Sequence, residues 1–235
     1  LTALKILPVY RTSEGVENLQ ENYKTFTACI DLFRKNGIIT IFSEGKCINE
    51  WHLRPLKKGT ARLAMKAWEE QIPLRVLPLG INYSSFRRFG KNVFLHFGHV
   101  ITRENFSMGD PDGARHLAFN NELKEQLEQL VWEIGKHDKE KQQQRLEIKP
   151  SRLKKILLSI PALAGFIIHA PLFIPVKRFT WKRTFDNDHY DSVMTGLLFL
   201  LYPLLLILLT VISWLILKTK WVLLLLLVLP FTAWA

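Results

Sequence analysis

The sequence has little cysteine. Its two cysteines, Cys29 and Cys47, form no close spacing and no metal-binding pattern, and Cys29 falls in a segment with helical periodicity, where we expect a buried free thiol. The sequence also has no detectable internal repeat. Basic residues outnumber acidic ones by 32 to 21, but they form no single run interleaved with aromatic residues, so we do not expect nucleic-acid binding.

The basic residues instead flank long apolar segments, which is typical of chains that contact anionic lipid headgroups. Residues 193–217 contain no charge and predict a transmembrane helix, and residues 221–235 predict the start of a further one. The chain begins with Leu1 and ends inside an apolar run, so we expect both ends to be cut from a longer sequence. The flanking basic positions are Lys149, Arg152, Lys154, Lys155, Lys177, Arg178, Lys182 and Arg183.

A third apolar segment, residues 156–176, differs because it contains Pro161, Pro171 and Pro175. Basic clusters stand at both of its ends, and the positive-inside rule places both ends on the cytoplasmic side. A re-entrant or interfacial segment satisfies this better than a simple span, which remains the alternative. The acids around His189 directly precede the next apolar run, and we interpret Asp191 or Ser192 as a helix N-cap rather than as part of a metal site.

The first half of the sequence alternates helical and strand patterns. Apolar residues recur every three or four positions over 16–35, and 59–71 predicts a second helix; strands are predicted at 38–42, 74–83 and 92–98. The alternation predicts an α/β fold, with a mixed sheet flanked by helices, followed by C-terminal membrane helices. Residues 121–145 predict one solvated helix that ends before Pro150. The predicted domains are 1–120, a charged helical linker at 121–155, and a membrane region at 156–235.

The most informative stretch is an acidic turn followed by a basic loop. Residues 42–45 read Phe-Ser-Glu-Gly at the end of a predicted strand, and residues 54–62 read Arg-Pro-Leu-Lys-Lys-Gly-Thr-Ala-Arg at the start of a predicted helix. Positive side chains beside a helix N-terminus form a natural seat for a phosphate, because the free N–H groups there also favour an anion. A solvated basic loop is the plain alternative.

Two further blocks extend this pattern: Leu-Pro-Val-Tyr-Arg at 7–11 and Val-Leu-Pro-Leu-Gly at 76–80. With these blocks in order, the chain resembles the glycerophospholipid acyltransferase family, and looks most like the bacterial 1-acylglycerol-3-phosphate acyltransferase type. The resemblance covers residues 1–105 and implies a glycerolipid acyltransferase-like α/β domain, incomplete at its N-terminus.

The resemblance implies a role for each matching residue. Arg11 matches an arginine that contacts the acceptor's phosphate, and Lys57 and Lys58 match the basic step at the helix start. Glu44 is the acid expected to position them. An arginine usual after the acidic turn is missing, and we expect Lys46 or Arg54 to replace it. The implied substrate-binding set is Arg11, Ser43, Glu44, Gly45, Lys46, Arg54, Lys57, Lys58 and Gly59.

The resemblance also implies a catalytic base, the histidine of a His-x-x-x-x-Asp motif that precedes the first block. None of the seven histidines is followed by aspartate at that spacing, so no catalytic residue is assigned. We expect the motif before residue 1, and we expect these 235 residues alone to bind acceptor without turnover. His52 has no acidic partner that the sequence can assign, and we interpret it as a solvated loop histidine.

The implied function is transfer of a fatty acyl group from acyl-CoA or acyl-carrier protein to a hydroxyl of glycerol-3-phosphate or 1-acylglycerol-3-phosphate in phospholipid biosynthesis. We expect a multi-pass membrane protein whose acyltransferase domain faces the cytoplasm, without a cofactor or metal. One alternative is a non-catalytic, membrane-anchored lipid- or phosphate-binding protein. Another is a structural membrane anchor whose soluble domain serves a partner.

Overall fold

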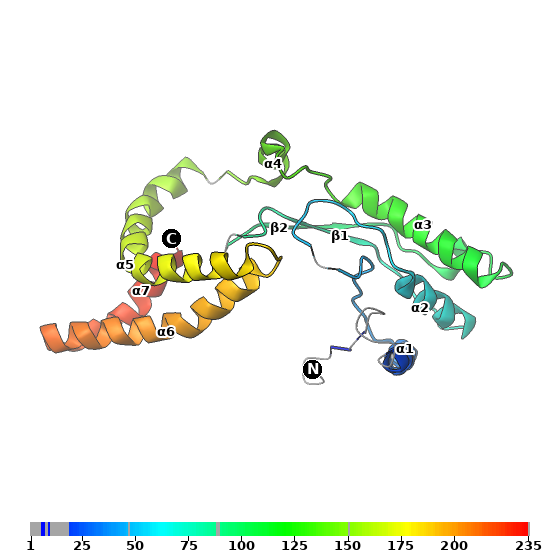
Figure 1. Ribbon diagram of the computed structural model, residues 1–235, viewed down its shortest axis with the longest axis horizontal. Coiled ribbons are helices and arrows are strands. Elements are labelled where there is room, and N and C mark those ends of the chain that lie inside the picture. Colours follow the sequence, from blue (N-terminus) through cyan, green and yellow to red (C-terminus); the bar gives the residue numbers. More distant parts are fainter. Residues whose placement is uncertain are drawn as a thin grey trace. The chain divides into compact units, whose positions relative to one another are not determined.

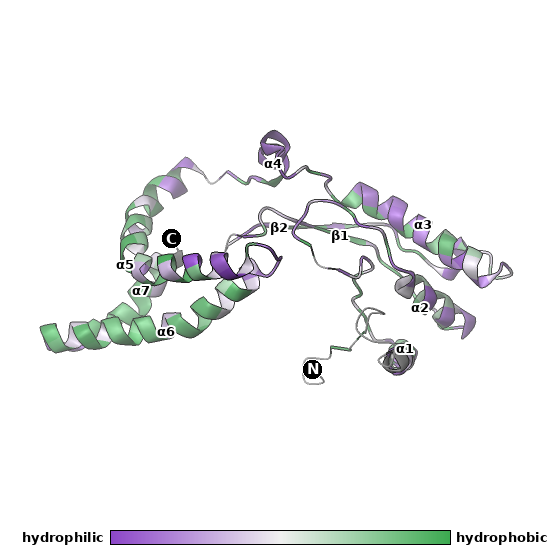
Figure 2. Ribbon diagram, in the orientation of Figure 1, coloured by the Kyte–Doolittle hydropathy of each residue, from purple (hydrophilic) through white to green (hydrophobic). Residues whose placement is uncertain are grey.

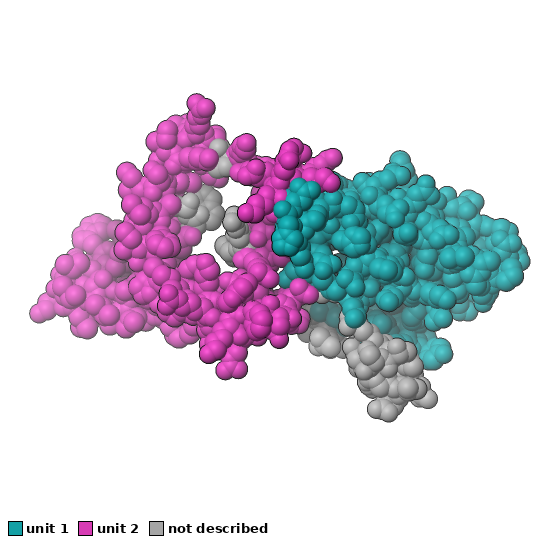
Figure 3. Space-filling view, turned by 45° about the horizontal axis from the view of Figure 1, so that its top comes forward, with its two compact units in different colours: residues 1–82, 93–138 teal, residues 83–92, 139–235 magenta. Residues whose placement is uncertain are grey.

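A computed structural model describes residues 6–7, 9, 19–46, 48–87, 90–149 and 151–234. The chain divides into two compact units, shown in teal and magenta in Figure 3. Unit 1 comprises residues 1–82 and 93–138, and unit 2 comprises residues 83–92 and 139–235. Arg11, Cys47 and Pro150, for which the sequence makes predictions, lie outside the described residues. Figure 1 labels the elements along the chain.

The core of unit 1 lies between two helices, α2 (Lys58–Glu69) and α3 (Asp112–Leu130). The Trp68 ring of α2 stacks on the Phe106 ring and lies tilted against the Phe119 ring of α3. The Trp68 indole N–H is satisfied by the Leu74 carbonyl oxygen at 2.9 Å. The buried core consists of Ala61, Ala64, Met65, Trp68, Ile101, Phe119 and Leu123.

A second cluster joins α1 (Leu19–Arg34) to the other face of α2. Cys29 and Ile30 of α1 are buried there against Leu63 and Ala67, so the predicted burial of Cys29 is confirmed. Arg34 closes α1 with an ion pair to Glu70, just beyond α2, at 2.6 Å. The helix predicted at 59–71 therefore carries two apolar faces, one for each neighbour.

The described sheet has two strands, β1 (Leu79–Tyr83) and β2 (Val93–Phe97), rather than the predicted mixed sheet. Gly98 N–H donates to Pro78 at one end of the pair and Ser84 N–H donates to Asn92 at the other, so the strands run antiparallel. Both strands fall inside segments predicted to be strands. An isolated antiparallel bridge between Val76 and Ile101 extends the pairing.

Two predicted elements differ in the structure. Residues 38–42 form no strand, because no described segment pairs with their backbone; Ile38 is 90% exposed and Phe42 is 75% exposed. The single helix predicted at 121–145 is interrupted: α3 ends at Leu130, and α4 (Lys139–Leu146) is separate. The interruption coincides with a tertiary contact, since Asn82 binds the backbone on both sides of Val131.

Unit 2 contains three apolar helices, α5 (Arg152–Thr184), α6 (Tyr190–Leu217) and α7 (Leu225–Trp234), with the short 3₁₀ helix η5 (Lys220–Leu224) before α7. Helices α5 and α6 are long and apolar enough to cross a membrane. Figure 2 shows both as largely hydrophobic, with hydrophilic residues at both ends of α5. The uncharged run predicted at 193–217 lies entirely within α6.

Helix α5 continues through Pro161, Pro171 and Pro175 without a break. Figure 1 shows that it bends along its length rather than running straight. Each proline removes a backbone donor from the helix and crowds the preceding turn, which is the usual cause of a sharp kink. Ser151 caps the helix by accepting a hydrogen bond from Lys154 N–H at 3.2 Å. The re-entrant path of this segment stays a prediction.

The facing ends of α5 and α6 contact Arg87 and Lys91 of the same unit. Lys91 forms an ion pair with Asp191, and the Arg87 guanidinium lies 4.8 Å from the centre of the Trp181 ring. The N-cap of α6 is His189, not Asp191 or Ser192 as predicted, and Asp191 lies in the first turn. An acidic residue there still complements the positive helix end.

Candidate functional site

The acidic turn and the basic helix start, distant in sequence, lie together in unit 1. Lys57 N–H donates to the Ser43 carbonyl at 2.7 Å, and the Ser43 hydroxyl lies 2.8 Å from the Thr60 hydroxyl. Thr60 belongs to the first turn of α2, so Ser43 joins the turn to the helix by backbone and side chain. The structure therefore brings together two of the segments predicted to share a site.

Gly45 gives this turn its shape. Its backbone φ is +66°, which favours glycine, and its N–H donates to the Phe42 carbonyl at 3.1 Å. A Cβ placed there would approach the Lys57 side chain to 3.1 Å, closer than ordinary van der Waals contact. Glycine thus permits the close approach of the turn to the residue that precedes α2.

The N-terminus of α2 is rich in positive charge. Lys57 is its N-cap and makes no side-chain capping hydrogen bond, and both Lys57 and Lys58 are exposed. Apart from its chain neighbours and the backbone of its own helix, no described residue has an atom within 4 Å of the position that a Gly59 Cβ would take. Open space, two ammonium groups and unfilled helix N–H groups suit a phosphate oxygen. Lys46 is also exposed, but it belongs to the loop rather than to the helix.

The Glu44 side chain holds the loop by binding a backbone N–H of the loop rather than a basic side chain. Its Oε2 accepts a hydrogen bond from Arg54 N–H at 3.2 Å, and the Arg54 guanidinium lies 3.6 Å from Glu50 instead. Burial raises the pKa of the Glu44 carboxyl above its usual range, although the Arg54 N–H and the charges of Arg54 and His52 oppose this. Glu44 therefore fixes the path of the loop, while Glu50 directs the guanidinium.

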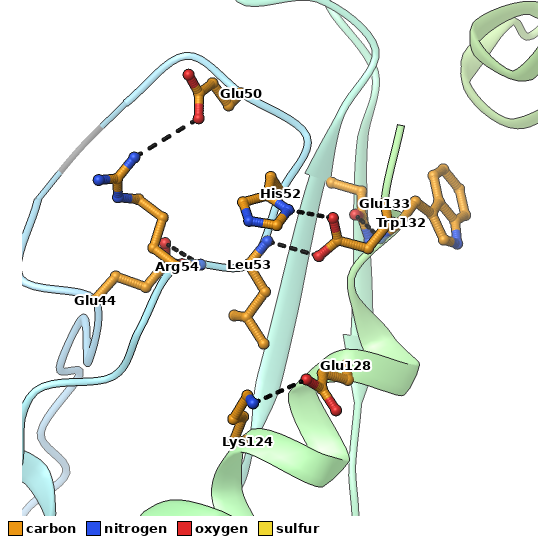
Figure 4. Close-up of polar contacts among 10 residues, drawn as sticks. Glu44, Glu50, His52, Leu53, Arg54, Lys124, Glu128, Trp132 and Glu133 are labelled. Carbon is orange, nitrogen blue, oxygen red and sulfur yellow. Dashed lines mark hydrogen bonds and ion pairs between the residues drawn. The ribbon is translucent and has the colours of Figure 1, made fainter. Parts of the chain in front are cut away.

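Sequence analysis missed the partner of His52. In the structure His52 Nδ1 contacts Glu133 Oε2, while Glu133 Oε1 accepts a hydrogen bond from Leu53 N–H at 2.8 Å (Figure 4). Both side chains are accessible, 61% for His52 and 48% for Glu133. No local pattern could have found this pair, because the two residues lie 81 positions apart.

Hydrogen bonds on both sides of Glu133 fix its place. Ile134 N–H donates to the Trp51 carbonyl at 3.0 Å, in an antiparallel bridge. Trp132 N–H donates to the Asn82 side-chain oxygen at 2.8 Å, and the Asn82 amide donates to the Leu130 carbonyl at 2.9 Å. Asn82 is 2% exposed at the end of the matched β1 strand. The segment after α3 is thus pinned beside the loop that carries His52.

Comparison with known proteins agrees with the resemblance. Residues 1–82, which include the acidic turn, the basic loop and α2, match the Acyltransferase family. The match over these residues supports an acyltransferase, within the transferase class. No curated protein and no solved structure matches the chain. An acyltransferase requires an acyl donor and an acceptor. The site described above lies on the matched segment and on the segment after α3 that carries Glu133.

Proposed function

We propose that the protein transfers a fatty acyl group from acyl-CoA or acyl-carrier protein to a hydroxyl of glycerol-3-phosphate or 1-acylglycerol-3-phosphate, as a step of phospholipid biosynthesis. The observation that carries the proposal is the junction of the acidic turn with the N-terminus of α2, where Lys57 N–H binds the Ser43 carbonyl. This junction lies inside the segment that matches the Acyltransferase family.

The chemistry of the junction suits a phosphorylated acceptor. Lys57 and Lys58 offer two mobile ammonium groups, and the first turn of α2 offers backbone N–H groups whose dipole favours an anion. Gly59 leaves room for the phosphate to approach the helix. Arg54, held near Glu50, offers a planar donor group on the same loop. Together these groups would hold the phosphate while leaving the acceptor's hydroxyl free to react.

Removal of the two lysines tests the acceptor site. The variant carries Lys57→Ala and Lys58→Ala, and its control carries Lys66→Ala and Lys124→Ala, which remove the same charge from exposed positions elsewhere on α2 and on α3. A charge-assisted contact contributes about 1.5–3 kcal/mol, so the Kd for glycerol-3-phosphate should rise by at least about tenfold in the first variant only. Equal affinity in both variants would contradict the proposed site.

The same assay separates the enzyme from a binding protein. The release of free thiol from acyl-CoA, measured with each acceptor, reports transfer, whereas the Kd reports binding alone. Binding that depends on Lys57 and Lys58 without any thiol release would support the alternative of a non-catalytic, membrane-anchored phosphate-binding protein.

We also propose that the acyltransferase unit lies on the cytoplasmic side of a membrane that unit 2 enters more than once. Helix α6 has 28 residues, about 42 Å, which exceeds a hydrocarbon core of about 30 Å. Basic residues stand at both ends of α5, and the helix is bent, so a path that enters and leaves on one side is favoured.

Cysteine labelling tests this topology. In a chain carrying Cys29→Ser and Cys47→Ser, Leu153→Cys and Phe185→Cys lie at the two ends of α5 and Ile216→Cys lies at the end of α6; all three parent side chains are exposed. A membrane-impermeant maleimide applied to one side of sealed vesicles should label positions 153 and 185 together and position 216 from the other side. Labelling of 153 and 185 from opposite sides would show a simple span.

A further inference from the structure

We propose that the C-terminal end of α5 binds the anionic headgroup of a membrane phospholipid through cationic side chains around Trp181; this inference rests on the proposed placement of unit 2 in a membrane. The cations are Arg87, from the segment between β1 and β2, and Lys177 and Arg178 of α5. All of them belong to unit 2. The two α5 cations directly follow the apolar residues 156–176, where a helix that enters a membrane reaches the headgroup layer.

The Trp181 ring is contacted from two directions. It meets the ring of Tyr190, a buried residue at the start of α6, edge to face, with 5.9 Å between the ring centres. The Arg87 guanidinium carbon lies over the Trp181 ring, 4.8 Å from its centre, and the quadrupole of an indole attracts a cation in that position. Trp181 itself is 47% exposed. The ring therefore presents a guanidinium group at the surface of unit 2.

The segment that carries Arg87 is attached to the start of α6. Lys91 forms an ion pair with Asp191 in the first turn of that helix. Asn92 N–H donates to the Ser84 hydroxyl at 2.8 Å, and Ser84 N–H donates to the Asn92 carbonyl at 2.9 Å, which closes the loop. These contacts hold the loop against the helices. They also neutralise Lys91, which is why it is not among the cations of the proposed site.

The cations of α5 lack an internal counter-charge. Lys177 and Arg178 stand four and three residues before Trp181, so both are its neighbours on the helix surface, and both are exposed. Within the described part of the chain, no carboxylate forms an ion pair with Lys177, Arg178 or Arg87. The Lys177 ammonium instead lies 5.8 Å from the centre of the Phe173 ring. This surface therefore complements an external anion.

The chemistry of the surface favours a lipid headgroup as the anion. A guanidinium group donates paired N–H groups to phosphate oxygens, and an anionic membrane surface attracts each nearby lysine or arginine. One helical turn before the cations, Phe173 and Ile174 are exposed apolar side chains, where the acyl chains of a bound lipid would lie. A free phosphate has no use for these apolar contacts, whereas a phospholipid carries its phosphate directly beside its chains.

Native mass spectrometry of the full 235-residue chain tests the site. The chain, in micelles of a neutral detergent, is mixed with equal amounts of a phosphatidylglycerol and a phosphatidylcholine that carry the same acyl chains. The ratio of the two lipid complexes is then measured, and the wild type should favour phosphatidylglycerol. Each cation beside an anionic headgroup contributes about a fivefold preference, so Arg87→Gln with Arg178→Gln should lower the ratio by at least about tenfold.

Two further variants separate this site from positive charge in general. Arg145→Gln with Arg152→Gln removes the same charge from exposed arginines before and at the start of α5, and should keep the wild-type ratio. Trp181→Leu keeps an apolar side chain but removes the ring face beneath Arg87, and should lower the ratio by about two- to fivefold. Trp181→Phe, which retains an aromatic face, should restore part of that loss.

A wild-type ratio near one overturns the inference whatever the variants do. An equal fall in the two arginine pairs also overturns it, because charge alone would then account for the preference. Loss of the phosphatidylglycerol complex to inorganic phosphate, beyond the effect of sodium chloride at the same ionic strength, would show a site for free phosphate and not for a lipid. Absence of both lipid complexes overturns the inference together with the membrane placement of unit 2, whereas acceptor binding through Lys57 and Lys58, measured separately, still decides the proposed activity.

Discussion

The two units differ in where they place many of their apolar and polar side chains. In unit 1 the core residues between α2 and α3 are at most 4% exposed. In unit 2, Phe199 is 78% exposed and Leu204 is 61% exposed, whereas the hydroxyl-bearing Thr180 is fully buried. The core of unit 1 has the arrangement expected in aqueous surroundings, where the burial of apolar area drives folding. Unit 2 has the arrangement expected where the surroundings are themselves apolar and helices meet through small or polar residues.

The largest expected effect breaks the core of unit 1. Phe119 is fully buried, and Phe119→Ala should lower the free energy of unfolding by about 3–5 kcal/mol, because the lost transfer energy adds to the cost of a cavity. Leu204→Ala in α6 should change it by no more than about 0.5 kcal/mol. Urea denaturation followed by circular dichroism in one detergent measures both. Comparable losses would mean that α6 is packed like a water-soluble core, and the comparison between the units would fail.

A smaller effect concerns the packing of helices within unit 2. A Cβ on Gly165 of α5 would lie 2.7 Å from the carbonyl carbon of Thr232 in α7, so Gly165→Ala must push two backbones apart, at a cost of about 1–3 kcal/mol. At Gly196 of α6 no described residue, apart from its chain neighbours and its own helix backbone, has an atom within 4 Å of that position, and Gly196→Ala should stabilise its helix by up to about 1 kcal/mol.

The melting temperatures of the two glycine variants, measured in the same micelles, should therefore move in opposite directions. A rise in both melting temperatures would show that α5 and α7 do not approach closely at Gly165. Such a result would leave helix propensity as the shared cause, and the contrast between the two units would lose the close helix contact on which it rests.

Elements with a local cause could be predicted from the sequence. The apolar spacing of α2, the alternation in β2 and the uncharged run within α6 are properties of adjacent residues, and each appears where it was predicted. The link between the acidic turn and the helix start also follows from sequence blocks in order. The path of residues 38–42 could not be predicted in this way, because a strand exists only when a partner strand pairs with it, and no described segment provides one.

The contacts that place Glu133 could not be predicted, because they depend on tertiary packing. Helical propensity favours a helix through residue 131, but one buried amide, Asn82, binds the Leu130 carbonyl and the Trp132 N–H and turns the chain away. This turn delivers Glu133 to His52 across 81 positions. A single polar side chain therefore overrides the local pattern and creates a pair that spacing alone cannot reveal.

The smallest expected effect concerns Glu44, which the sequence predicted to position the loop but not to be partly buried. Burial raises the pKa of the Glu44 carboxyl above its ordinary value of 4.5. The folded protein then binds this proton more tightly than the unfolded chain does, so its contribution to stability is greatest at acid pH and declines as the pH rises through 4.5 and above. Glu44→Gln keeps an oxygen to accept the Arg54 N–H but does not titrate.

The stability of the wild type relative to Glu44→Gln should therefore fall between acid and neutral pH. Urea midpoints over that range measure it, and Glu125→Gln, at an exposed position of α3, controls for the loss of one negative charge. A relative stability that rises with pH would mean that the Arg54 N–H and the charges of Arg54 and His52 outweigh burial. In that case Glu44 would be a stabilising ion within the basic loop, and the loop would be held by charge rather than by a half-buried hydrogen bond.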